Sequence, residues 1–262
     1  MRSVAPMVRQ VVLLGSILAA AAVAMGCKAT PAAPAAPGIA CPGGTVMTEA
    51  DEQGGRASTC MAGGQREGPY ARYFADGTIA EKGRFAAGAR DGAWISYYPH
   101  GRVQVETTYR AGVLHGNYRE HHSFGGDKTQ GVYEDGKKTG IWRGWHANGA
   151  VAHETPYIED QIHGIANEYW PRGGTKSTVQ YRMGREEGPA VYWHPLGNKA
   201  EQGEHVGGER IGLWRGWFEN GQLATEGTYR DGVKIGVWTT YDAAGNVLVE
   251  EDLGGGEAPP TP

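Results

Sequence analysis

The sequence has little of what helical, membrane-spanning or nucleic-acid-binding proteins need. Gly supplies 43 and Pro 14 of the 262 residues, so more than a fifth of the chain disfavours helix. The uncharged apolar run at residues 11–26 is shorter than the roughly 20 residues that span a membrane. The formal net charge is −4 and no block of basic residues is present, which excludes the usual electrostatic footprint for nucleic acid.

Motifs of catalysis are also missing. The sequence contains no Gly-rich phosphate loop, no metal-spaced Cys pair and no nucleophile elbow. Residues 61–251 follow a repeat pattern, described below, which leaves no stretch for a separate catalytic domain. We therefore expect a protein that is not an enzyme and that uses no cofactor or metal.

The N-terminus has the features of an export signal. Two arginines precede the apolar run at residues 11–26, whose length suits the h-region of a signal peptide. The run ends in Ala24-Met25-Gly26 before Cys27, an arrangement similar to the bacterial lipobox, in which the Cys is acylated. We expect residues 1–26 to be a signal peptide and Cys27 to be lipidated. Ordinary cleavage after Ala24, leaving a free thiol, is the alternative.

Only three cysteines are present, Cys27, Cys41 and Cys60. If Cys27 carries lipid, Cys41 and Cys60 are left as a pair for a disulfide in an oxidising compartment, although two unrelated thiols are the alternative. In the chain-entropy model such a bond stabilises by about 3 kcal/mol. Residues 27–40 are predicted to hold the lipidated Cys and an extended Ala/Pro-rich linker, and residues 252–262 a disordered tail.

A 24-residue repeat accounts for most of the chain. Its first position is occupied by Gly68, Gly92, Gly116, Gly140, Gly164, Gly188, Gly212 and Gly236. A second Gly follows nine residues later in all eight copies. A third Gly, four residues before the first, is replaced only at Asp160. Self-similarity at a fixed period indicates a tandem array.

Each repeat reads as two strands and two turns. Aromatic residues between the first and second Gly favour a strand. The second Gly occurs in Asp76-Gly77, Asn148-Gly149 and Asn220-Gly221, dipeptides favoured in two-residue hairpin turns that need positive φ. An alternating strand follows, and its eighth residue is Phe or Tyr in six copies and His205 in one.

We therefore predict an all-β fold, an elongated single-sheet antiparallel array of eight 24-residue β-hairpins over residues 61–251. Stacked hairpins bury a continuous surface that one hairpin alone cannot bury. Residues 41–64 resemble a degenerate extra copy, which we interpret as a capping hairpin that protects the sheet edge and that the Cys41–Cys60 disulfide would fasten.

Histidines recur at one repeat position. His122, His146 and His194 are equivalent, and His121 precedes the first. Equivalent residues in successive hairpins lie two strands apart, about 9.6 Å, which is too far to share a zinc ion unless the side chains converge. We interpret these histidines as substitutes for aromatic residues.

Two aromatic columns are candidates for a binding surface. Trp94, Trp142, Trp214 and Trp238 lie two residues after the first Gly. The candidate binding aromatics lie five residues after it: Tyr73, Tyr97, Trp145, Tyr169, Trp193, Trp217 and Tyr241. Opposite parity sends the two columns to opposite faces of a regular strand. A column open to solvent would form an apolar binding surface, and the alternative is that the rings stack on each other as core.

The order Gly-x-Trp/Tyr, aromatic, Asn/Asp-Gly, Tyr and Gly at fixed offsets resembles the bacterial variant of the MORN repeat (membrane occupation and recognition nexus) over residues 61–251. Repeats five and six depart from it at Ala166 and Ala190, where weaker packing or a bend is expected. The resemblance implies a scaffold that holds protein partners, sometimes lipids. Many bacterial variants carry the label of antitoxins of a toxin–antitoxin family.

These observations lead to one expected function and two alternatives. We expect an exported lipoprotein of the bacterial cell envelope, in the outer membrane, that is a non-catalytic binding scaffold for a protein partner and does not bind nucleic acid. A toxin-neutralising immunity protein would instead rescue growth when co-expressed with a neighbouring toxin. A glycan-binding or cell-wall-binding module would lose its binding when Trp145, Trp193 and Trp217 become Ala.

Overall fold

The computed structural model describes residues 38–50 and 54–255, and these residues form strands and no helix. None of the described residues belongs to a helix that could cross a membrane. The predicted signal peptide, Cys27 and residues 256–262 of the predicted tail lie outside the described residues.

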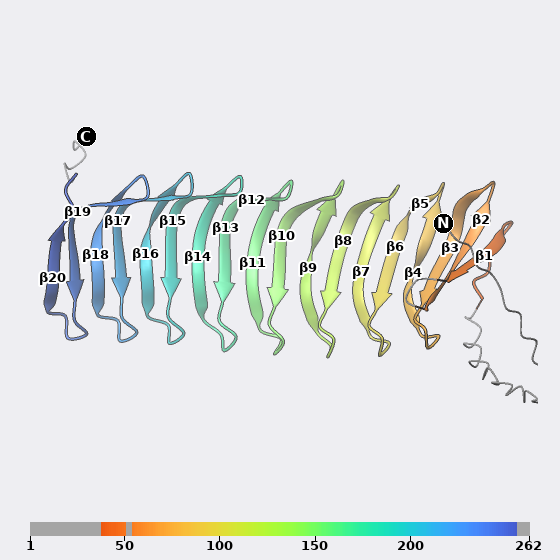
Figure 1. Cartoon of the computed structure of the whole chain (residues 1–262), viewed down its shortest axis with the longest axis horizontal. Helices are drawn as coiled ribbons and strands as arrows, with labels where there is room; N and C mark the ends of the chain where they lie inside the picture. The colour runs from red at the N-terminus through yellow and green to blue at the C-terminus, as the bar shows by residue number, and fades with distance from the viewer. Residues whose placement is uncertain (1–37, 51–53, 256–262) are drawn as a thin grey trace, which may run out of the picture. The chain divides into compact units, whose positions relative to one another are not determined.

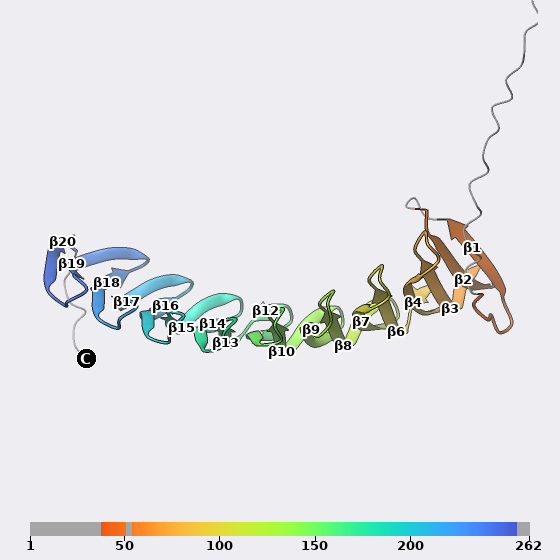
Figure 2. The ribbon, with the colours of Figure 1, turned by 90° about the horizontal axis from the view of Figure 1, so that it is seen from below.

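Twenty strands form one antiparallel sheet (Figures 1 and 2). The strands are β1 (Thr45–Ala50), β2 (Arg56–Ala62), β3 (Gln65–Tyr73), β4 (Ile79–Ala86), β5 (Ala89–Arg90), β6 (Gly92–Tyr97), β7 (Val103–Arg110), β8 (Val113–His121), β9 (Asp127–Glu134), β10 (Lys137–Trp145), β11 (Val151–Ile158), β12 (Gln161–Ile162), β13 (Gly164–Tyr169), β14 (Thr175–Arg182), β15 (Arg185–Trp193), β16 (Lys199–Val206), β17 (Glu209–Trp217), β18 (Leu223–Arg230), β19 (Val233–Tyr241) and β20 (Val247–Asp252).

The strands pair in chain order from β1 to β20. In two repeats the first strand is divided, so β4 pairs with both β5 and β6, and β11 with both β12 and β13. Counting each divided strand as one, β3 to β20 make the eight predicted hairpins, and β1 and β2 make one more before them. The predicted all-β hairpin array is confirmed.

The two-residue turns lie at the third Gly of the repeat. Ala86 pairs with Ala89, and the two residues between them, Ala87 and Gly88, both have positive φ (49° and 81°), as a type I′ turn requires. The N–H of Gly88 donates to the carbonyl oxygen of Arg66 in the preceding hairpin (3.0 Å), and the bond recurs in six further turns. One of these turns has Asp160 in place of the third Gly. Its N–H makes the same bond, and its carboxylate also accepts from the Lys138 N–H (2.7 Å).

Our prediction of two-residue turns at the Asp-Gly and Asn-Gly pairs is wrong. Phe74 and Thr78 close a three-residue loop, and within it Gly77 has positive φ (86°) while Asp76 does not. Asp76 is favoured there because its carboxylate accepts from the Thr78 N–H (2.9 Å) two residues on. The Asp or Asn side chain therefore acts as a hydrogen-bond acceptor, and the loop matches a type I turn followed by a left-handed Gly.

The first Gly of the repeat lies at an irregularity in the strand pairing. All eight have positive φ, from 62° at Gly236 to 112° at Gly164. Where β7 meets β8, the pairing of Thr107 with Tyr118 changes to that of Tyr109 with Leu114, so extra residues around Gly116 bulge out of the ladder. Gly is required because other residues seldom adopt this backbone conformation.

The core lies on one face of the sheet, which we call the core face and define by Trp94, Trp142 and Trp214, each 2% exposed. Trp94 on β6 packs edge-on against Phe85 on β4 and Tyr109 on β7. Its ring centroid lies 5.2 Å from that of Phe85 and 6.0 Å from that of Tyr109. Equivalent contacts surround Trp142 and Trp214, with His205 replacing one ring. For this column, the alternative that the rings stack as core is confirmed.

A glycine lies beneath each Trp of the core face. A Cβ atom added at Gly83, Gly131, Gly203 or Gly227 would lie 2.2–2.3 Å from the ring of Trp94, Trp142, Trp214 or Trp238. Where the first aromatic is absent, at Ala166 and Ala190, the glycine is absent as well, and Thr155 and Val179 replace it. Ala190 is completely buried and Val179 is 5% exposed in a cluster with Trp214, so the core continues through repeat six.

Candidate functional site

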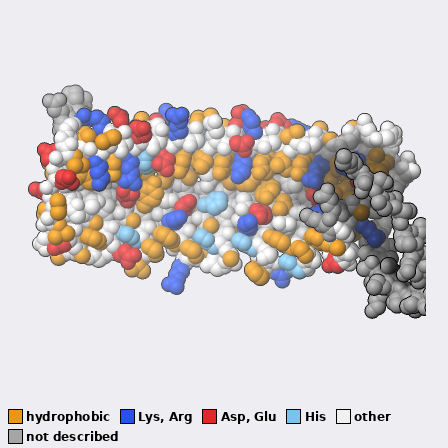
Figure 3. Space-filling model, viewed as in Figure 1, with side chains coloured by type: hydrophobic (Ala, Val, Ile, Leu, Met, Phe, Trp, Pro, Cys, Tyr) orange, Lys and Arg blue, Asp and Glu red, His pale blue; other side chains and the backbone are white. Residues whose placement is uncertain are grey.

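The rings of the core face are covered by cationic side chains. Arg90, Lys138, Arg210 and Lys234 lie 3.9–4.4 Å from the ring centroids of the four tryptophans. Arg210 also forms a two-fold hydrogen bond with the Glu201 carboxylate (2.6 and 2.8 Å). Figure 3 shows a band of hydrophobic side chains along the sheet with Lys and Arg side chains on it. The rings of this face are therefore already engaged in structural contacts.

The opposite face, which we call the open face, exposes a column of apolar side chains. Ile141, Ile165, Leu213 and Val237 lie one residue after the first Gly and are 63%, 55%, 48% and 55% exposed. In the other repeats this position holds Pro69, Ala93, Asn117 and Pro189. Only half of the members of this column are large and apolar, so the sequence alone does not identify it as an exposed surface.

The seven predicted binding aromatics are at most partly exposed. Tyr73 is 5% exposed, and the other six are half-buried. The hydroxyl of Tyr169 donates to the Glu154 carboxylate (3.2 Å), which also accepts from the Arg143 guanidinium of the same hairpin (2.8 Å). Burial, and then the neighbouring Glu154 carboxylate, raise the pKa of Tyr169, so this hydroxyl stays a donor at neutral pH.

The same arrangement recurs three repeats further on. The Tyr241 hydroxyl donates to Glu226 (2.8 Å), which accepts from Arg215 (3.2 Å). These contacts are separate from those of the core-face tryptophans, which pack against other rings. Two of the predicted aromatics, Tyr169 and Tyr241, thus join polar contacts between hairpins, and the role of all seven in binding stays a prediction.

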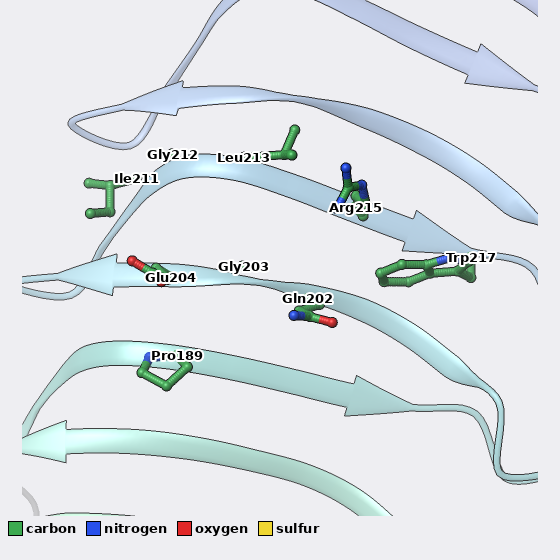
Figure 4. Close-up of a pocket in the computed structure, with 9 residues that line it drawn as sticks. All are labelled: Pro189, Gln202, Gly203, Glu204, Ile211, Gly212, Leu213, Arg215 and Trp217. Carbon is green, nitrogen blue, oxygen red and sulfur yellow. The ribbon is translucent and has the colours of Figure 1, made fainter. Parts of the chain in front are cut away.

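The open face is hollowed between β15, β16 and β17 (Figure 4). The hollow has a volume of about 290 Å³ and includes Trp217, one of the predicted aromatics. Its lining residues are Pro189, Gln202, Gly203, Glu204, Ile211, Gly212, Leu213, Arg215 and Trp217. Apolar, acidic and basic groups together suit a side chain or short segment of a protein better than one small apolar ligand.

The recurring histidines hold neighbouring repeats together. The Nε2 atoms of His122, His146 and His194 lie 2.8–3.0 Å from backbone carbonyl oxygens of the next repeat, to which they donate. In the part of the chain that the structure describes, no three His, Cys, Asp or Glu residues are grouped to hold a metal ion. The histidines therefore have a structural role beside the three-residue loops.

Cys41 and Cys60 form the predicted disulfide, with Cα atoms 5.5 Å apart. Cys60 lies on β2, where it pairs with Val46 of β1, and is 2% exposed. The bond thus ties the segment before β1 to the first strands of the sheet. The predicted pairing is confirmed.

One titratable side chain, His205, is buried in the core face. Glu186 accepts from His205 Nε2 (3.1 Å) and from the Tyr181 hydroxyl (3.2 Å). His205 is 5% exposed, and its Nδ1 atom is buried without a hydrogen-bond partner. Burial lowers the pKa of His205, with Arg210 acting in the same direction and Glu186 against it. Protonation would add a buried N–H without an acceptor, so we assign the neutral ring.

The lowered pKa predicts a loss of stability in mild acid. Between the folded and unfolded pKa values the unfolded chain binds more protons, so the His205 contribution is fully present above about pH 6.5 and is lost as the pH falls below it. His205→Tyr restores the aromatic residue of the other repeats, and we expect it to flatten the dependence of the unfolding free energy on pH in this range. The unfolding free energy is measured by urea unfolding at a series of pH values. The same pH dependence in both proteins would contradict the assignment.

The comparisons with known proteins agree with the repeat geometry. The family model described as MORN repeat variant matches residues 90–111 and 210–231. Both segments begin at an Arg that stacks on a core-face Trp and end in a two-residue turn. No curated protein matches the sequence. The two matched segments are thus similar to the MORN repeat variant, and their hairpins are part of one continuous antiparallel sheet.

Proposed function

We propose that the protein is a non-catalytic scaffold that holds a protein partner on the open face of its sheet. The observation that carries the proposal is the column of Ile141, Ile165, Leu213 and Val237, four large apolar side chains about half or more exposed at the same repeat position. Apolar side chains aligned on one face, with charged and aromatic groups beside them, are typical of surfaces that bind proteins.

The core face supports this assignment. Its tryptophans are buried, packed against other rings and covered by cationic side chains, so they stabilise the fold and are not free to bind a partner. On the open face, Leu213 and Trp217 border the hollow, and Arg215 and Glu204 provide charge of both signs there. A partner could therefore insert an apolar side chain between flanking polar contacts, the arrangement found in the centre of protein interfaces.

Affinity capture with matched variants tests the proposal. We expect the full chain to retain a partner from solubilised envelopes and Leu213→Asp/Val237→Asp to lose it. The matched control is Phe124→Asp/Leu196→Asp, which changes two exposed apolar side chains in three-residue loops, outside the strands that form the open face. A partner retained by all three proteins, or lost from both variants, would refute the assignment of the face. A captured toxin or cell-wall fragment would identify the toxin-neutralising or glycan-binding alternative.

We also propose that the scaffold is anchored in the cell envelope by lipid on Cys27. The proposal rests on the apolar run at residues 11–26 and the small residues before Cys27. Cys27→Ser is expected to move the protein from the membrane fraction to the soluble fraction, because the acylated thiol is lost. Cys41→Ser, which removes a cysteine without changing the lipidation motif, should stay in the membrane. Persistence of Cys27→Ser in the membrane would disprove the anchor.

A further inference from the structure

The C-terminal edge of the sheet is an open strand. β20 pairs with β19 on one side and has no neighbour among the described residues on the other. Its first three residues, Val247, Leu248 and Val249, are 54%, 62% and 55% exposed. A strand with unpaired backbone groups and exposed apolar side chains is a template for pairing with another strand.

The second half of β20 is acidic. Glu250, Glu251 and Asp252 follow one another, all are exposed, and within the described residues none of them forms a salt bridge. Their interior equivalents are different: Glu154 and Glu226, at the repeat position of Glu250, each accept from an Arg and from a Tyr of the next hairpin. At Glu250 the Arg of the same hairpin is replaced by Thr239, and among the described residues no further hairpin provides the Tyr.

We propose that β20 binds an extended segment of a partner protein in which basic residues precede apolar residues. Added antiparallel to β20, such a segment would place its basic side chains beside residues 250–252 and its apolar side chains beside residues 247–249. Backbone hydrogen bonds provide affinity in this mode of recognition, and the side chains provide specificity. The site is separate from the open face and does not depend on the function proposed for it.

Charge favours this occupant over a second copy of the chain. A second β20, added antiparallel, would place its own three carboxylates beside residues 247–249 and would leave residues 250–252 without basic partners. The opposite edge lacks the acidic signature: β1 has one carboxylate, Glu49, which pairs with Arg66 (3.8 Å). The geometry therefore points to the C-terminal edge alone.

Peptide binding to the full chain tests the proposal. The probe is the synthetic peptide Lys-Lys-Lys-Val-Thr-Val, and its control is Lys-Lys-Lys-Pro-Thr-Pro, which has the same charge but lacks two of the backbone N–H groups. Calorimetry is expected to show binding of the first peptide and at least about tenfold weaker binding of the second. Glu250→Lys/Glu251→Lys/Asp252→Lys should weaken binding of the first peptide by a similar factor.

A matched variant separates the edge from net charge. Glu134→Lys/Glu209→Lys/Glu219→Lys makes the same change of charge at exposed positions away from β20, and its affinity for the peptide should stay near that of the unaltered chain. Circular dichroism confirms that both variants are folded. Absence of binding, equal binding of the two peptides, or equal losses in the two triple variants would overturn the proposal.

Discussion

Gly203→Val is expected to destabilise the sheet by about 3 kcal/mol, at the upper end for overpacked cores. The Cβ atom alone would lie 2.2 Å from the Trp214 ring, which is held by stacking with His205 and Tyr229 and by Arg210 above it. The ring cannot retreat without losing these contacts and the hydrogen bond from its Nε1 to the Glu204 carbonyl (3.2 Å). Urea unfolding followed by Trp fluorescence measures the loss.

A second substitution provides the control. Trp214→Ala alone should cost about 3–5 kcal/mol through the loss of a buried ring. Gly203→Val/Trp214→Ala reproduces the pair that the chain itself uses at Val179 and Ala190, so its cost should be at least about 1 kcal/mol less than the sum of the two single losses. Additive losses would show that the glycine and the ring are not coupled.

Loss of the Cys41–Cys60 disulfide is expected to cost about 3 kcal/mol, because the bond closes a loop between residues 19 apart and thereby restricts the unfolded chain. The effect should be local, since β1 contacts the rest of the sheet through β2. Hydrogen exchange of Cys60→Ser is expected to quicken in β1, β2 and β3 and to stay unchanged from β15 onward.

Reduction of the unaltered chain should reproduce that result. Cys27→Ser is the matched control, since it removes the third cysteine and leaves the bonded pair in place. Faster exchange throughout the sheet after reduction would contradict a local role for the disulfide. Unchanged exchange in β1 and β2 would show that strand pairing alone holds the first hairpin.

The periodic glycines made the fold predictable from the sequence. Each recurring Gly adopts positive φ, so the bulge and the loop of every repeat require Gly at fixed positions in the sequence. The spacing of these positions predicts the hairpins. The turn types were not predictable in the same way. Asp76-Gly77 favours both a two-residue turn and a three-residue loop, and the choice depends on pairing of the flanking strands, which no dipeptide specifies.

The candidate site was less predictable than the fold. Aromatic character alone directed attention to Tyr73, Trp217 and their equivalents, but burial of a ring depends on contacts with neighbouring hairpins. The exposure of Ile141 and Leu213 was not predictable from residue type, because a hydrophobic residue beside a Gly in a strand is commonly part of a core. Strand parity relative to the core-face Trp is the signal that identifies them.

The hydrogen bond from each two-residue turn to the hairpin before it has a consequence for how such proteins change in length. Gly88 reaches Arg66 and Gly112 reaches Arg90, and neither bond passes beyond the adjacent unit. Inserting or deleting one whole 24-residue unit would therefore preserve all of these hydrogen bonds between hairpins except the one at the site of the change. Gene duplication could lengthen the protein stepwise and add a fresh copy of its surface each time, without redesign of the units already present.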